Sequence, residues 1–143
     1  MNIIESVYII DDTGATIFSN EIHIQGAGDV SQAILSNFLF ALQSIAKNLK
    51  DNEMKSIEMS NSKFLLSKEI STNYLFILKS NRDAELQIIK PIMKEIQVSF
   101  VKKFFEYETL FPEEKIQLLN SFKEDIRAIL KEKSNIEKFS ETI

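Results

Sequence analysis

The sequence predicts a soluble α+β domain in which five strands form an antiparallel sheet and three helices accompany it, in the order ββαβββαα. Three observations support this prediction. Five short strand-like segments lie within the first 80 positions. Apolar residues recur every three or four positions between the second and third of these segments, and again through the C-terminal third. The length of 143 residues suits one domain, which we expect at 1–133, followed by a polar, frayed tail at 134–143.

The first two strands are predicted to form a hairpin. Ser6–Ile10 is an apolar run of β-branched and aromatic residues, and 15–22 resumes β character with more polar positions. Between them lies Asp11-Asp12-Thr13-Gly14, whose aspartates and glycine are typical turn formers. Gly26-Ala27-Gly28 then breaks the pattern. We therefore expect a strand, a tight turn and a second, half-exposed strand.

A helix is predicted from Asp29 to about Lys50. Asp29 is suited to the N-cap, and the polar stretch at 50–53 marks the end. The apolar positions that recur at helical spacing are Val30, Ile34, Phe38, Ala41, Leu42, Ile45 and Leu49. We expect this stripe to face the core.

Three further strands are predicted as a meander. The segment 56–60 alternates apolar and polar residues, 63–68 is mixed, and 74–78 is apolar throughout. The strands at Val7–Ile10 and 74–78 are apolar at every position, as a strand covered on both faces must be. We therefore expect the first and last strands to be neighbours in the middle of the sheet, with the first helix crossing over to the far edge.

Two helices are predicted after the last strand. Pro112 followed by Glu113-Glu114 is a good helix start, because proline loses no hydrogen bond there and acidic residues favour the positive end of the helix dipole. Pro91 either kinks the preceding helix or begins it, and we favour the kink. The stripe of the first helix is Ile89, Ile92, Met93, Ile96, Phe100, Phe104 and Tyr107. The stripe of the second is Ile116, Leu119, Phe122, Ile126, Ile129 and Leu130.

The composition excludes several classes of protein. A formal net charge of −4 argues against a nucleic-acid binder, which needs an excess of lysine and arginine, and weakly against attraction to an anionic membrane. The absence of cysteine removes disulfides and thiolate metal sites. Neither a signal peptide nor an apolar stretch of roughly 20 residues is present, so we expect no transmembrane segment and a cytoplasmic location.

The element order and the segments Val7–Gly14 and Tyr74–Leu78 resemble the longin-like family over roughly residues 3–130. The resemblance implies a longin/profilin-like sheet of order 2-1-5-4-3, with one helix on one face and the two C-terminal helices on the other. It also implies a non-enzymatic protein-binding module without a cofactor, which regulates or docks a small GTPase in processes such as vesicle trafficking. The alternative is a structural subunit of a trafficking or tethering complex. We expect at most peripheral membrane association, through partners.

One sequence motif resembles part of an enzyme. Apolar residues before Asp12-Thr13-Gly14 are typical of aspartic proteases, in which paired aspartates activate water. Such enzymes are nearly all β and rich in glycine, whereas this chain has 3 glycines and long helical patterns. We favour a hairpin turn, in which aspartate bonds to the backbone and glycine supplies a positive φ. The protease remains a distant third hypothesis.

Other possible sites are weaker. Asp11 and Asp12 could hold a divalent cation, but no further ligands lie nearby in the sequence. His23 is the only histidine, so a site of two histidines is excluded. Gly26-Ala27-Gly28 lacks the spacing of phosphate-binding loops. We therefore expect Asp11 and Asp12 to lie in a solvated turn, His23 to lie on the surface, and Gly26-Ala27-Gly28 to be a connector.

The predicted partner-binding residues are Leu35, Leu39, Phe40, Ile57 and Met59. The first three lie off the apolar stripe of the first helix, so they either pack under other elements or expose an apolar face. The other two lie on the third strand, which could pair with a strand of a partner. We expect a homo- or heterodimer through one of these surfaces.

The aromatic stretch 100–107 is a second candidate surface. Phe104 and Phe105 cannot both point into one core, and Lys102-Lys103 beside them could suggest a helix on a membrane surface. Glu106 and Glu108 dilute that charge. A helix that is partly core and partly interface is therefore favoured.

Overall fold

The computed structural model describes residues 3–21, 32–50, 53–59, 61–104 and 109–141. The chain forms two compact units. The first comprises Ile4–Asp83, and the second comprises Ala84–Ile143 together with Met1–Ile3. Each unit is described by itself.

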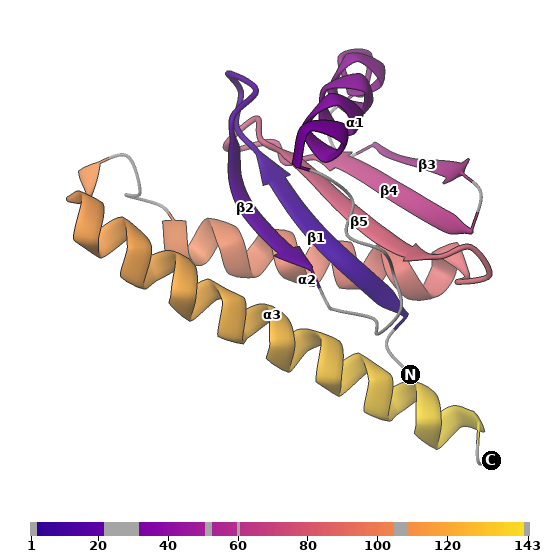
Figure 1. Cartoon of the computed structure of the whole chain (residues 1–143). Coiled ribbons are helices and arrows are strands. Elements are labelled where there is room, and N and C mark those ends of the chain that lie inside the picture. The colour runs from indigo at the N-terminus through magenta and orange to yellow at the C-terminus, as the bar shows by residue number, and fades with distance from the viewer. Residues whose placement is uncertain (1–2, 22–31, 51–52, 60, 105–108, 142–143) are drawn as a thin grey trace. The chain divides into compact units, whose positions relative to one another are not determined.

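The first unit is built on a five-stranded antiparallel sheet (Figure 1). Its strands are β1 (Ile4–Ile10), β2 (Thr16–Glu21), β3 (Met54–Met59), β4 (Ser62–Lys68) and β5 (Leu75–Asn81). Their order across the sheet is β2-β1-β5-β4-β3. The predicted order is therefore confirmed, and so is the pairing of the first strand with the last.

The register shows why parts of the central strands are apolar at every position. Tyr8 lies opposite Ile77, and Ile77 lies opposite Leu66, so these three side chains share one face of the sheet. Val7 and Ile9 alternate with Tyr8 along β1 and are fully buried too. A stretch buried on both faces needs apolar residues at every position, and Val7–Ile10 of β1 and Leu75–Leu78 of β5 meet that requirement.

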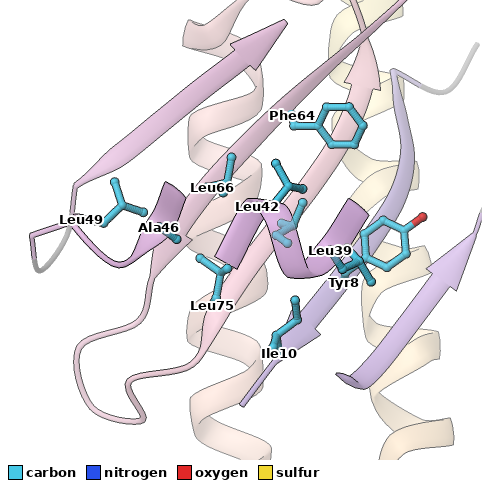
Figure 2. Packing of buried hydrophobic residues seen from close by; sticks show 10 residues of the cluster. Tyr8, Ile10, Leu39, Leu42, Ala46, Leu49, Phe64, Leu66 and Leu75 are labelled. Atoms are coloured by element: carbon cyan, nitrogen blue, oxygen red, sulfur yellow. The ribbon is translucent and has the colours of Figure 1, made fainter. Parts of the chain in front are cut away.

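Helix α1 (Gln32–Ala46) lies on one face of this sheet (Figure 1). It contributes Leu39, Leu42 and Ala46 to a buried cluster that also includes Leu49, just after the helix. Figure 2 shows these side chains directed toward the sheet. The partners on the strands are Tyr8, Ile10, Phe64, Leu66, Leu75 and Ile77.

The buried face of α1 differs from the predicted stripe. Leu39, Leu42, Ala46 and Leu49 face the core, whereas Ala41 is exposed and Ile45 is 41% exposed. The helix ends at Ala46 rather than near Lys50, and the amide of Leu49 bonds to the carbonyl of Ala46 at 2.9 Å. That bond turns the chain and keeps Leu49 in the core. Asp29, the predicted N-cap, lies outside the described residues.

The second unit contains α2 (Leu86–Phe104) and α3 (Pro112–Glu141). Pro91 lies inside α2, so it does not begin that helix. Pro112 begins α3, as predicted, with Glu113 and Glu114 in the first turn. The helix continues to Glu141, through the segment expected to be a frayed tail. Lysine and glutamate, frequent at 131–138, are strong helix formers, which accounts for the continuation.

An aromatic cluster holds the two helices of this unit together. Phe122 of α3 lies edge-on to Phe100 and to Phe104 of α2, with ring centroids 5.4 Å apart in both pairs. Phe100 and Phe104 are stacked at 4.2 Å. Beside the rings, Lys103 forms an ion pair with Asp125. Phe105 lies outside the described residues.

The apolar stripe predicted for α2 is confirmed within its described part, from Ile89 to Phe104. Tyr107, its last predicted member, lies outside the described residues. On α3, Phe122, Ile126 and Leu130 are buried, but Ile116 is 60% exposed. The stripe of α3 therefore begins later than predicted.

Candidate partner-binding surface

Strand β3 is an edge of the sheet. It pairs with β4 from Met54 opposite Ser67 to Met59 opposite Ser62, and among the described strands it has no neighbour on its other side. Within the described part of the chain, no strand pairs with the backbone N–H and C=O groups on that side. An edge of this kind is a template for pairing with another chain.

Apolar side chains emerge between α1 and this edge. Ile57 lies opposite Phe64 in the ladder, and the ring of Phe38 on α1 lies 4.8 Å from that of Phe64. Phe38 and Ile57 are half-buried against the core. Met59 is on the same face of β3, two residues further on, and is 46% exposed. We name Phe38, Ile57 and Met59 the α1–β3 seam.

The predicted partner-binding residues are divided between core and surface. Leu39 is 6% exposed and packs in the core, whereas Phe40 is 70% exposed. Successive helical residues point about 100° apart, so the two cannot serve one surface. Leu35 lies on α1, but its side chain is outside the described part of the structure. The structure places Ile57 and Phe38 beside Phe64, and Met59 shares the face of β3 that carries Ile57.

The spacing of Phe38 in the sequence predicts a core position, but it does not indicate that this side chain lies in the α1–β3 seam. Two stripes compete on α1: one through Phe38, Leu42 and Ile45, and one through Leu39, Leu42, Ala46 and Leu49. Both stripes keep helical spacing and both reach Leu49, just after the helix, so the spacing contains no signal that separates them.

A pocket of about 350 Å³ lies at one end of the first unit. It is lined by the β1–β2 turn, by Phe40 and Gln43 of α1, by Lys47 just after that helix, and by Lys68 and Asn73 around the β4–β5 turn. Its charges balance, since Asp11 and Asp12 oppose Lys47 and Lys68. We name it the turn pocket.

Asp11 in the turn pocket is a structural residue. Its Oδ1 accepts hydrogen bonds from the amide and hydroxyl of Thr13, at 2.9 and 2.6 Å, and from the amide of Ala15, at 2.9 Å. Burial would raise the pKa of Asp11, but these hydrogen bonds outweigh burial and hold that pKa below its ordinary value. Gly14 has a φ of 98°, in the left-handed region. The predicted turn is confirmed.

The turn geometry bears on the hypotheses of a protease and a metal site. Asp12 is exposed, and Asp11 accepts the hydrogen bonds of the turn, so both carboxylates fit the predicted hairpin turn. Within the described residues, no group of three or more His, Cys, Asp or Glu side chains could hold a metal ion. His23 and Gly26–Gly28 lie outside the described residues.

A second carboxylate organises the β4–β5 turn. Glu69 is 9% exposed and accepts hydrogen bonds from the amides of Ser71 and Thr72, at 3.0 and 2.7 Å, and from both hydroxyls. Burial would raise the pKa of Glu69, but the bonds from Thr72 and Ser71 lower that pKa below its ordinary value. Asn73 completes the turn with a φ of 64°, which asparagine tolerates well.

We expect Glu69→Gln to weaken the first unit and to flatten its response to acid. A carboxyl whose pKa is lowered by folding stabilises the fold above its unfolded pKa of about 4.3 and loses that contribution as the pH falls through the folded pKa. The amide of glutamine accepts fewer of these bonds, so the free energy of unfolding at pH 7 should fall by about 1–3 kcal/mol. Urea unfolding at pH 7 and pH 3 measures both effects. Asp12→Asn, at an exposed position, is the control; equal losses in both variants would contradict the assignment.

The fold, but not the sequence, matches known proteins. No family model matches the sequence, and no curated protein matches it either. By structure, 31 chains match. One comes from the structure of the mammalian SRP receptor, with a TM-score of 0.56 and 10% identity over 96% of this chain and 99% of that chain. Together with the sheet order, this likeness shows a longin-like fold.

In the part of the chain that the structure describes, each helix is too short or too polar to cross a membrane.

Proposed function

We propose that this chain is a non-enzymatic protein-binding module of the longin type, and that it docks or regulates a small GTPase. The observation that carries the proposal is the open edge of β3 beside the α1–β3 seam. The longin-like fold supports the class of protein, and the resemblance of the sequence to that family supports the class of partner.

The seam offers two kinds of contact to one partner. The outer backbone of β3 can hydrogen-bond to an extended strand, which supplies affinity. Phe38, Ile57 and Met59 form an apolar strip beside that edge, which gives a partner side chains to pack against. A globular partner whose own sheet has a free edge strand fits both features.

The charges on β3 discourage indiscriminate pairing. Lys55 and Glu58 are exposed on the strand, and Glu58 lies 3.9 Å from Lys63 and 3.7 Å from Arg82. Exposed ion pairs of this kind contribute little to stability, but charged side chains on an edge hinder unspecific strand addition. A partner strand must therefore present complementary charges, which makes the surface selective.

The test uses Met59→Asp, because Met59 is 46% exposed and its replacement leaves the core intact. Affinity purification with the wild-type chain, followed by mass spectrometry, identifies the partner. Binding to that partner is then measured by calorimetry. We expect Met59→Asp to weaken binding at least about tenfold, which corresponds to about 1.4 kcal/mol. Ile70→Asp, at a 58% exposed position in the β4–β5 turn, is the matched control and should bind like wild type.

The role in the partner's cycle is tested separately. A module that regulates a GTPase should change the rate of nucleotide exchange or hydrolysis when it is added to the purified GTPase, and Met59→Asp should remove that change. A stable complex without any effect on either rate would favour the structural subunit of a larger assembly. Unchanged partner binding by Met59→Asp would exclude the α1–β3 seam as the binding surface.

A further inference from the structure

The second unit carries a groove of its own between α2 and α3. The groove has a volume of about 550 Å³, and its apolar lining comes from Val98 of α2 and from Ala128 and Ile129 of α3. Val98 is 60% exposed, although valine is usually buried. Lys94 and Lys102 line the groove on either side of Val98. This combination is not explained by the packing of the two helices.

The lysines belong to a row along α2. Lys90, Lys94, Val98 and Lys102 follow one another at intervals of four residues, so they lie on one face of the helix. All are exposed, and among the described residues none of the three lysines is in an ion pair. Like charges four residues apart repel each other and destabilise a helix, and an anionic partner would relieve that repulsion.

Two acidic residues also line the groove, but they do not neutralise the positive charge of the lysine row. Asp125 is already paired with Lys103, which lies outside the lining of the groove. Glu95 is half-buried, whereas the lysines are exposed. The accessible rim of the groove is therefore positive around an apolar floor.

We propose that this groove binds an acidic, helical peptide segment of a partner protein through one apolar anchor. The anchor packs on Val98, Ala128 and Ile129, and carboxylates on either side of it pair with Lys94 and Lys102. Eight helical residues span about 12 Å, so a ligand with acidic residues eight positions apart and a leucine midway mirrors the row. Helices with such spacing bind grooves by their apolar face.

The shape of the site favours a peptide over a membrane. Lipid-binding helices insert several protruding apolar side chains into the bilayer. Here Val98 and Ala128 are exposed and Ile129 is half-buried, so Val98 is the one large apolar side chain that protrudes at the groove. A recess with charges on its rim accepts a side chain from a partner. The net charge of −4 for the whole chain also opposes attraction to an anionic surface.

The test is fluorescence anisotropy of the full chain with a labelled helical peptide that carries the pattern Glu-x3-Leu-x3-Glu. We expect saturable binding that weakens with salt, and a loss of roughly tenfold or more in the double variant Lys94→Glu/Lys102→Glu. Lys50→Glu, an exposed charge reversal in the first unit, should bind like wild type. Val98→Asp should abolish binding by placing a charge where the leucine packs.

Three outcomes would overturn the proposal: no binding of this peptide, equal binding by the double variant, or equal binding by a peptide with alanine in place of leucine. A second experiment, cosedimentation with vesicles that contain phosphatidylserine, tests whether the lysine row binds a membrane. Cosedimentation that requires Lys94 and Lys102, without peptide binding, would assign the row to a membrane instead. Met59→Asp should leave peptide binding unchanged, so the failure of this proposal and that of the seam are distinguishable.

Discussion

Replacing Leu39 by aspartate should lower the free energy of unfolding of the first unit by about 4 kcal/mol or more. Leu39 is 6% exposed and packs with Leu42 and Tyr8 in the cluster between α1 and the sheet. The change removes an apolar side chain from this core and places a carboxylate there without a partner. Urea unfolding followed by circular dichroism measures the loss.

The adjacent position supplies the control. Phe40 is 70% exposed, so Phe40→Asp should change the free energy of unfolding by no more than about 0.5 kcal/mol. Equal stability of the two variants would contradict the orientation of α1 on the sheet. Loss of partner binding in Leu39→Asp would report unfolding, not a contact, so this residue is unsuitable for mapping a binding surface.

The second large effect is expected at Phe122. Phe122→Ala should destabilise the helical unit by about 3–5 kcal/mol, because Phe122 is fully buried and its ring contacts both Phe100 and Phe104. The two edge-on contacts add about 0.5–1.5 kcal/mol each beyond the burial of apolar area. Thermal and urea unfolding, monitored at 222 nm as is usual for helices, give the size of the loss.

Ile116→Ala on the same helix is the matched control. Ile116 is 60% exposed, so its truncation should cost no more than about 0.5 kcal/mol. A loss at Ile116 as large as that at Phe122 would mean that the apolar stripe of α3 begins at its first turn, as the sequence pattern suggested. A small loss at Phe122 would mean that the aromatic cluster does not hold the helices together.

The architecture of the sheet could be predicted because its signals are local and redundant. Val7–Ile10 and 74–78 are apolar at every position, and this pattern predicts two neighbouring central strands, which the sheet order confirms. The turn at Asp11–Gly14 was predictable for a different reason. An aspartate that bonds to the amide two residues on, followed by a glycine at positive φ, is chemistry contained within the turn itself.

The candidate surface could be predicted only in part. Ile57 and Met59 were recognised because they lie on a strand with an alternating pattern, and they do lie at the sheet edge. The face of α1 was predicted wrongly at Ala41 and Ile45, because a helix this rich in apolar residues admits two stripes. Choosing between them requires knowing where Phe64 and Leu66 stand on the sheet below.

The groove in the second unit shows another limit. The spacing of Lys90, Lys94 and Lys102 is visible in the sequence, and so is the valine between them. The recess beside Val98 depends on where Ala128 and Ile129 of α3 are placed. A helix pattern records which residues share a face, but not which neighbour lies across from that face.

The pairing of β1 with β5 also shapes how the chain folds. Tyr8 lies opposite Ile77, so β1, the first strand to be synthesised, can pair on that side only after β5, the last strand, has been synthesised. Contacts so distant along a chain slow folding. During synthesis they also leave the backbone edge of β1 unpaired and its apolar side chains exposed. A nascent chain that ends before Leu75 would carry two additional open edges, on β1 and on β4, besides the outer edges of β2 and β3, and would be prone to aggregation until β5 enters between them.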